Sequence, residues 1–152
     1  MANPHVKVDT SVIDRILRNL DGNTSEAVRA VAFSVEAKAK EQIRVLRAID
    51  TGAMLNSVYT RTAKSAYSGG RASSDGAVAA RVKALNKDAK IEELPIPRGE
   101  HEAFVGPSVE YAIAVHYGDN RRSGRPYLQN AVNDVGRDME RHFRDVVTDG
   151  QR

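Results

Sequence analysis

Apolar residues recur at intervals of three and four in two long parts of the chain, and this spacing predicts two amphipathic helices. The first is expected from residue 24 to 48, and the second from Pro126, because proline suits the first turn of a helix. A shorter helix is expected over residues 10–20, ended by Gly22. The apolar stripes of the two long helices consist of Val28, Val31, Val35, Ala39, Ile43 and Leu46, and of Leu128, Ala131, Val132, Val135, Met139, Phe143 and Val146.

Between the two long helices the pattern changes to that of strands and loops. Residues 57–62 (SVYTRT) are rich in β-branched and aromatic side chains, and residues 77–85 (AVAARVKAL) alternate around valine and alanine, so both are predicted to be strands. A third strand is predicted over residues 101–106 (HEAFVG). Residues 66–76 are predicted to form a flexible loop and residues 86–100 a long excursion, because glycine, serine, proline and mixed charges dominate them.

The order of these elements predicts the fold class. A short helix is expected from Ser108 to Gly118, so the order becomes helix, helix, strands, helix, helix. This order favours an α+β fold in which a small antiparallel β-sheet is packed by a long N-terminal-half helix and a C-terminal helix, with long polar loops. The length of 152 residues suits a single domain (1–152), and residues 1–9 and 148–152 are expected to be loosely ordered tails.

The composition describes a core built from small and aliphatic side chains. Hydrophobic residues make up 41% of the chain, aromatic residues 5%, and there is no tryptophan. The lack of cysteine excludes disulfides and thiolate metal sites and suits a reducing cytosol. No segment has the roughly 18 apolar residues of a membrane span, and the N-terminus lacks the apolar core of a signal peptide. We therefore expect a soluble protein that is made inside the cell and has no membrane partner.

Positive charge is concentrated in the middle of the chain, although the formal net charge is only +3. Such a cluster can mark a surface that binds DNA or an acidic protein. The alternative is that these residues simply keep exposed loops soluble. Tyrosines do not alternate with them in a repeating way, so sequence-specific recognition of DNA is not expected. The residues of this basic segment, which we treat as a DNA-facing hypothesis, are Arg61, Lys64, Arg71, Arg81, Lys83, Lys87 and Lys90.

The sequence shows no arrangement typical of catalysis. His101 and Glu102 begin a predicted strand, but no second pair at metal-ligand spacing accompanies them. The motifs of zinc metalloproteases, serine hydrolases, P-loop enzymes and dinucleotide-binding folds are absent. We therefore expect no enzymatic activity, no cofactor and no metal site.

Three stretches, in this order and spacing, resemble one protein family. They are DTGAMLNSV (residues 50–58), FVGPSVEYAIAVHYG (104–118) and RPYLQNAV (125–132). They are similar to motifs of the head-to-tail joining proteins of long-tailed bacteriophages, the neck or tail-completion family. This chain departs from the family pattern at His116, which replaces an acidic residue, and at Tyr127, which replaces a phenylalanine.

The resemblance implies a structural protein of the virion. Members of this family assemble as a ring, usually of six subunits, between the head-closure ring and the tail tube and around the path of the genome. For this chain the resemblance implies a homo-oligomer that contacts a head-closure or adaptor protein and the tail-tube protein, close to DNA. The implied location is the virion neck, at the head–tail junction, after synthesis in the host cytoplasm.

The same stretches select residues for an interface and for the backbone. The loop after Gly118 is expected to reach a neighbouring subunit, and Arg125 has the strongest claim because it lies in the RPYL motif. The arginines could instead face DNA or solvent, and the tyrosines could belong to the core. The residues expected at a subunit or partner interface are Tyr117, Arg121, Arg122, Arg125 and Tyr127, and those expected to be required by the backbone are Gly52, Gly106, Gly118 and Pro126.

Two further expectations concern the loops and the alternatives. Residues 63–76 and 86–100 are long for loops of a compact domain and are expected to become ordered on contact with partner rings.

A tail terminator or head-closure protein of the same neck region is an alternative function. A small host DNA-associated protein that uses the basic segment is a second alternative function.

Overall fold

The computed structural model describes residues 3–9, 24–46 and 52–149, with the side chains of residues 3–7, 28–46 and 52–139. It confirms the α+β class and contains a five-stranded antiparallel sheet with the strand order β1-β5-β2-β3-β4. The helix predicted over residues 10–20 lies outside the described residues. The elements are β1 (Val6–Asp9), α2 (Thr24–Val45), α3 (Ala53–Ser57), β2 (Tyr59–Thr62), β3 (Ala66–Ser68), β4 (Arg71–Ser73), α4 (Asp75–Leu85), β5 (Glu102–Gly106), α5 (Ala112–Tyr117) and α6 (Tyr127–Asp149).

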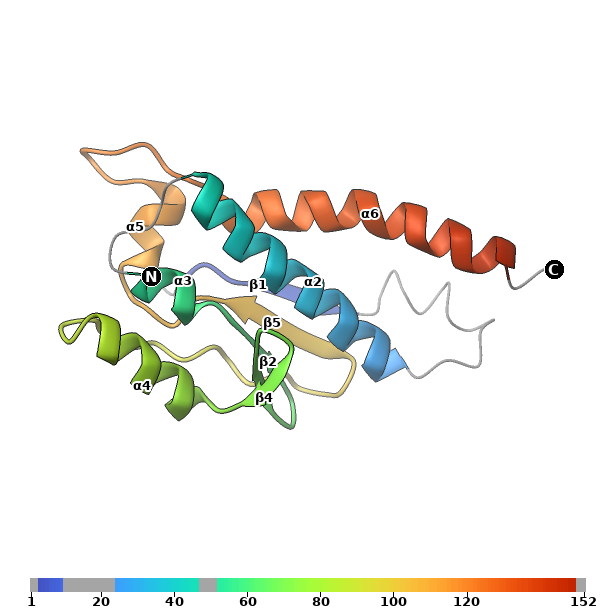
Figure 1. Cartoon of the computed structure of the whole chain (residues 1–152), viewed down its shortest axis with the longest axis horizontal. Coiled ribbons are helices and arrows are strands. Elements are labelled where there is room, and N and C mark those ends of the chain that lie inside the picture. Colours follow the sequence, from blue (N-terminus) through green and yellow to red (C-terminus); the bar gives the residue numbers. More distant parts are fainter. Residues whose placement is uncertain (1–2, 10–23, 47–51, 150–152) are drawn as a thin grey trace.

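The long helix α2 packs on the sheet and also along α6, while α4 lies on the side away from α6 (Figure 1). The predicted apolar stripes account for this packing, because residues three and four apart share one face of a helix. Side chains of α2 and α6 also bond to each other, since Gln42 donates from Nε2 to Oδ2 of Asp134 at 3.1 Å. Among the described side chains, the fully or almost fully buried apolar residues of the two helices are Val28, Ala32, Val35, Ala39 and Ile43 in α2, and Tyr127, Leu128, Ala131 and Val135 in α6.

A buried carboxylate joins α2 to the sheet. Glu36 of α2 is 1% exposed, and its carboxylate accepts a hydrogen bond from the Thr60 hydroxyl of β2 at 2.8 Å. It also accepts one from the backbone N–H of Gly69, in the turn between β3 and β4, at 2.7 Å, and pairs with Nζ of Lys40 at 2.7 Å. These partners offset the cost of burying a charge. Glu36 therefore fixes α2 against both β2 and the β3–β4 hairpin.

The other face of the sheet is covered by residues 86–100 and the start of α4. Side chains alternate along a strand, so Tyr59 faces this side while its neighbour Thr60 faces α2. Leu94 and Pro97 from the 86–100 segment are buried here. The segment is thus anchored to its own subunit at Leu94, although most of its other side chains are exposed. Its further ordering on contact with partner rings stays a prediction.

The loop predicted over residues 66–76 is instead a β-hairpin. β3 and β4 pair in antiparallel register, with Tyr67 opposite Ala72. Gly69 and Gly70 form the turn with φ angles of 61° and 76°, a left-handed conformation that suits a two-residue hairpin turn. The strands were missed because each has only three residues and β4 has no apolar alternation.

The strand predicted over residues 77–85 is wrong, since this segment belongs to α4. Val78 and Val82, four residues apart, are its buried side chains, as expected for one face of a helix. Ser74 caps the helix, because its side chain accepts a hydrogen bond from the N–H of Ala77 at 3.0 Å. The apparent alternation of small residues was therefore misleading, and the capping serine was the better signal.

The remaining predictions differ mainly at their boundaries. The strands predicted over residues 57–62 and 101–106 are confirmed as β2 and β5. β1 lies within the predicted N-terminal tail (1–9) and pairs with β5, Val6 lying opposite Val105. The short helix begins at Ala112 instead of Ser108, because Ser108 donates its N–H to the carbonyl of Ser57 at 3.1 Å.

We predict that Glu36→Ala lowers the free energy of unfolding by about 2–4 kcal/mol, because Thr60, Gly69 and Lys40 lose a common buried partner. Urea unfolding followed by circular dichroism measures this change. Glu41→Ala is the matched control, since it removes an exposed carboxylate from the same helix and should leave the unfolding midpoint almost unchanged. Equal effects of the two substitutions would contradict the role of Glu36.

Candidate interaction site

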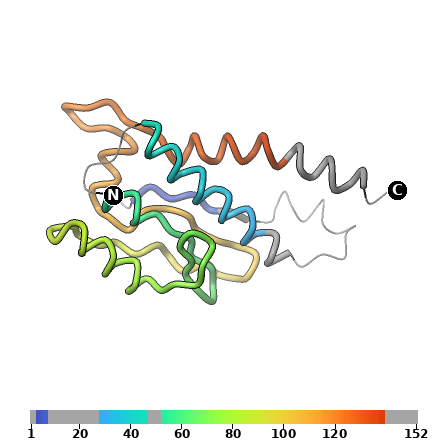
Figure 2. The backbone as a smooth tube through the Cα atoms, in the orientation of Figure 1, coloured from blue at the N-terminus to red at the C-terminus, as the bar shows by residue number. Residues whose placement is uncertain are grey.

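The connection between α5 and α6 leads away from the body of the molecule, as the orange loop in Figure 2 shows. We call residues 119–125 the arginine loop, because Arg121, Arg122 and Arg125 all lie in it and are exposed. A β-bridge between Gly118 and Ser123 brings its two sides together. The N–H of Arg125 donates to the carbonyl of Val115 at 2.8 Å, which ties the end of the loop to α5.

Two glycines close the base of the arginine loop. A Cβ atom on Gly118 would lie 2.6 Å from the backbone nitrogen of Gly124, and one on Gly124 would lie 2.6 Å from the carbonyl carbon of Tyr117. Gly118 also has a φ of 87°, which other residues rarely adopt. The two sides of the loop can approach this closely because neither position has a side chain.

A carboxylate inside the loop holds its backbone. Oδ1 of Asp119 accepts hydrogen bonds from the N–H groups of Arg121 and Arg122, both at 2.8 Å. These N–H groups are therefore already used, and the loop offers a partner its guanidinium groups instead of its backbone. Within the described part of the chain, the side chains of Arg121 and Arg122 have no ion-pair partner.

Aromatic rings from both sides of the arginine loop pack against one another. The ring of His116 makes edge-to-face contacts with Tyr117 and Tyr127, at centroid distances of 4.6 and 5.2 Å. Tyr117 is 63% exposed, whereas Tyr127 is completely buried. Of the two tyrosines expected at an interface, Tyr117 thus lies on the surface and Tyr127 lies in the core of the subunit.

His116 is half-buried, and both of its ring nitrogens are shielded from solvent. Neither of its ring nitrogens has a hydrogen-bond partner among the described residues. Burial lowers the pKa of His116, because the charged imidazolium is disfavoured away from water. The ring is therefore neutral near pH 7 and packs as an apolar group under the arginine loop.

The residues of the basic segment come from several elements. They lie in β2, the β2–β3 connection, β4, α4 and the segment after α4. Arg71, Lys83 and Lys87 are exposed, and Arg81 donates to the Ser68 hydroxyl at 3.1 Å. The other three pair with carboxylates: Arg61 with Asp75 at 3.4 Å, Lys64 with Glu100, and Lys90 with Glu110 at 3.8 Å.

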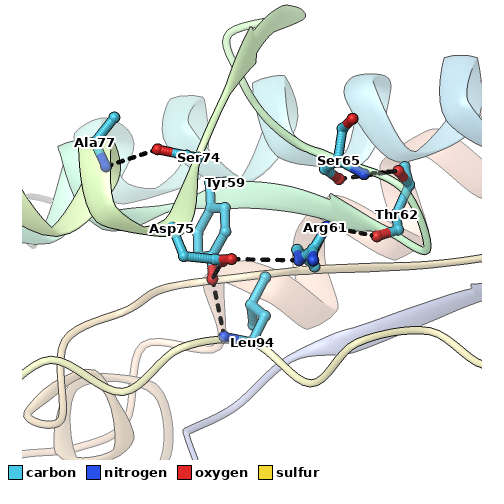
Figure 3. Close-up of polar contacts among 8 residues, drawn as sticks. All are labelled: Tyr59, Arg61, Thr62, Ser65, Ser74, Asp75, Ala77 and Leu94. Carbon is cyan, nitrogen blue, oxygen red and sulfur yellow. Dashed lines mark hydrogen bonds and ion pairs between the residues drawn. The ribbon is translucent and has the colours of Figure 1, made fainter.

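A buried polar cluster, which sequence reasoning missed, joins three segments on the second face of the sheet (Figure 3). The Tyr59 hydroxyl donates to Oδ1 of Asp75 at 2.6 Å and accepts from the N–H of Leu94 at 2.9 Å. Nε of Arg61 lies 3.4 Å from Oδ2 of Asp75. Burial raises the pKa of Tyr59, so the hydroxyl stays protonated. Because Tyr59 is fully buried and bonds to both Asp75 and Leu94, this cluster holds α4 and residues 86–100 on the sheet.

The other positions assigned to the backbone have definite surroundings. Gly52 has a φ of 80° before α3. A Cβ on Gly106 would lie 2.9 Å from the carbonyl oxygen of Pro4, so β5 and the N-terminal segment approach closely there. The carbonyl of Pro126 accepts from the N–H of Asn130 at 2.9 Å, so Pro126 is the residue directly before α6, and the helix starts one position later than predicted.

Two other kinds of site have no counterpart in the described part of the chain. Among the described residues, no three His, Asp or Glu side chains are grouped so that they could hold a metal ion. None of the helices in the ranges that the structure describes is long and apolar enough to cross a membrane.

Comparison of the chain with protein-family models, with curated proteins and with solved structures finds no match.

We predict that Gly124→Ala changes the conformation of the arginine loop, because the new methyl group would collide with the backbone at Tyr117. The backbone amide signals of residues 115–125 in an NMR spectrum should shift, and the N–H of Arg125 should exchange faster with solvent. Gly99→Ala is the control, since a Cβ there meets nothing within 4 Å. A Gly124→Ala spectrum that matches the wild type in this region would disprove the close approach.

The lowered pKa of His116 predicts that the stability of the chain depends on pH. The pKa of His116 is lowered in the folded chain, so below about pH 6.5, the ordinary pKa of histidine, the unfolded chain binds more protons than the folded chain. The contribution of His116 is thus complete above pH 6.5 and is lost as the pH falls below it. Replacing His116 by Phe should reduce the loss of stability between about pH 7 and pH 5, measured by urea unfolding. Parallel pH profiles for the two proteins would count against this role.

Proposed function

We propose that this chain is a structural subunit of the neck of a long-tailed bacteriophage. Copies of it form a ring, of six subunits if it follows the family it resembles, which joins the head-closure complex to the tail tube around the DNA. The ring contacts a head-closure or adaptor protein on one side and the tail-tube protein on the other. In this role the chain works through its surfaces and needs neither catalysis nor a cofactor.

The observation that carries this proposal is the meeting of the three family-like stretches in one part of the fold. The first stretch contains α3, the second runs from the end of β5 through α5, and the third begins α6. Ser57 and Ser108 join the first two through a backbone hydrogen bond of 3.1 Å, and Arg125 and Val115 join the last two at 2.8 Å. The first stretch, which is distant in the sequence from the other two, therefore builds one unit with them, and the arginine loop projects from it.

The arginine loop has the composition of a protein contact. Exposed arginine and tyrosine side chains dominate the binding energy of many protein interfaces, and Arg121, Arg122 and Tyr117 are all exposed here. Gly118 and Gly124 hold the loop in one shape, which reduces the entropy lost when it binds. These features favour a carboxylate-bearing protein surface as the partner of the loop.

A host DNA-associated function has less support. Three of the seven basic residues in the basic segment already pair with carboxylates. The other four belong to β4, to α4 and to the segment after α4, without the repeating spacing that a phosphate-binding track would favour. DNA lies near the protein in the proposed ring, but the basic segment is not its central feature.

We predict that the double substitution Arg121→Ala with Arg122→Ala leaves the subunit folded but impairs the joining of heads to tails. Exposed charges contribute little to folding, whereas a weakened interface is repeated at every subunit around the ring. The test is complementation of a phage that lacks the gene, with joined particles counted by electron microscopy. Unattached heads and tails beside a soluble, folded variant are the expected result.

The matched control for this experiment is Arg71→Ala, which removes an exposed arginine from the β3–β4 hairpin on another part of the surface. This variant should give normal particles. Normal yields of infectious particles with the double variant would refute the interface at the arginine loop. Failure of the wild-type gene to restore any joining would refute the proposed function itself.

A further inference from the structure

A groove lies beside α5, next to the arginine loop. Its volume is about 520 Å³, and its lining includes the side chains of Ala89, Tyr111, Ile113 and Ala114. Gly118 lies at the end of this groove and also borders the hollow formed by the arginine loop, so the two surfaces are continuous. Asp88, Lys90 and Glu110 also line the groove, so its apolar part is bordered by charged side chains, with the arginine loop beside it.

The side chain of Ile96 is suited to bind in such a groove, because it is apolar and exposed. Ile96 is 65% exposed and lies between Pro95 and Pro97. The segment is fixed on both sides, because Leu94 donates its N–H to the buried Tyr59 hydroxyl at 2.9 Å and Pro97 is buried. Prolines restrict the backbone, so little conformational entropy remains to be lost when Ile96 binds.

Ile96 is held away from the groove of its own subunit. The chain leaves the groove at Lys90 and then pairs with the segment before α5, through a bridge between Ile91 and Val109. Leu94 is next anchored under the sheet by Tyr59. Contact between Ile96 and a groove therefore requires a second copy. Because the two surfaces are different, the contact is head-to-tail, the kind that closes into rings.

The charges of the two surfaces are complementary. Residues 92–100 contain three glutamates and one arginine, whereas the arginine loop contains three arginines and one aspartate. Glu93 is exposed, and within the described part of the chain it has no ion-pair partner. It lies three residues before Ile96, about 10 Å away in an extended segment. With Ile96 in the groove, Glu93 can thus approach the arginine loop at its end.

We propose that residues 92–98 of one copy dock into the groove beside α5 of a second copy, with Ile96 in the groove and Glu93 against Arg121 and Arg122. This inference deepens the proposed function, since it names the partner of the arginine loop as a second copy of this chain. It is tested on the purified full chain, without phage.

The first test compares two equally exposed apolar residues. The wild-type chain should self-associate with increasing concentration in sedimentation velocity experiments. Ile96→Asp should weaken this association by roughly ten- to a hundredfold, because it removes one buried aliphatic side chain from each interface. Val45→Asp is the control, as Val45 is 66% exposed on α2, and it should associate like the wild type. A wild-type chain that stays monomeric at every concentration, or equal effects of both variants, would overturn the docking.

The second test exchanges charges across the interface. Glu93→Arg alone and Arg122→Glu alone should each weaken self-association, and an equimolar mixture of the two variants should associate better than either alone. Glu41→Arg replaces Glu93→Arg in the control mixture, because Glu41 is exposed on another surface. No recovery in the mixture, or equal recovery with Glu41→Arg, would disprove the pairing of Glu93 with the arginine loop.

A third test uses the absence of cysteine from the chain. A variant with both Ile96→Cys and Ala114→Cys should form disulfide-linked species larger than dimers on oxidation, because each copy offers two different sites. Dimers alone, or no linked species, would overturn a head-to-tail arrangement.

The two proposals fail in different ways. If Ile96→Asp abolishes self-association but the wild-type gene restores no joining of heads to tails, the proposed function fails and the docking stands. If the wild-type gene restores joining and Ile96→Asp changes neither assay, the docking fails and the proposed function stands.

Discussion

The buried carboxylate of Glu36 is the interaction on which the arrangement of the subunit depends. It holds α2 against β2 and the β3–β4 hairpin through Thr60 and Gly69, and Lys40 balances its charge. α6 packs along α2, so the position of α6 follows from that of α2. The arginine loop precedes the first turn of α6, and its direction is therefore set by an interaction in the middle of the fold.

The surface of the subunit depends on a second constraint, the close approach of Gly118 and Gly124. This approach, together with the capping of two N–H groups by Asp119, gives the arginine loop a fixed shape before any partner binds. A fixed loop beside an apolar groove suits a subunit that meets the same neighbour in every copy of a ring. The proposed function draws on the exposed arginine, tyrosine and isoleucine side chains of this surface.

Periodicity was sufficient to predict the long elements. α2 and α6 have apolar residues at three- and four-residue intervals over several turns, and β2 and β5 contain β-branched or aromatic residues at buried positions. Short elements were missed, because β3 and β4 have too few residues for a pattern and the valines of α4 also fit an alternating strand. For these short elements the useful local signals were Ser74, which caps a helix, and the Gly69–Gly70 pair, which suits a tight turn.

The candidate site was predicted in part. Gly118 and the three arginines of the loop lie close together in the sequence. The sequence was therefore sufficient to predict this loop. The groove was not, because Ala89 and Ile113 come from segments that meet only through tertiary contacts such as the hydrogen bond between Glu110 and Lys90 at 3.0 Å. The cluster of Tyr59, Asp75 and Leu94 was hidden for the same reason, since its partners lie 16 and 35 residues from Tyr59.

The proposed neck ring is tested most directly by a reconstruction, at a resolution that shows side chains, of the particles made in the complementation experiment with the wild-type gene. The account predicts a ring of copies at the head–tail junction, in which the arginine loop of each subunit lies against a neighbouring copy. A protein found elsewhere in the particle or absent from it, or a ring whose arginine loops all face solvent, would contradict the account.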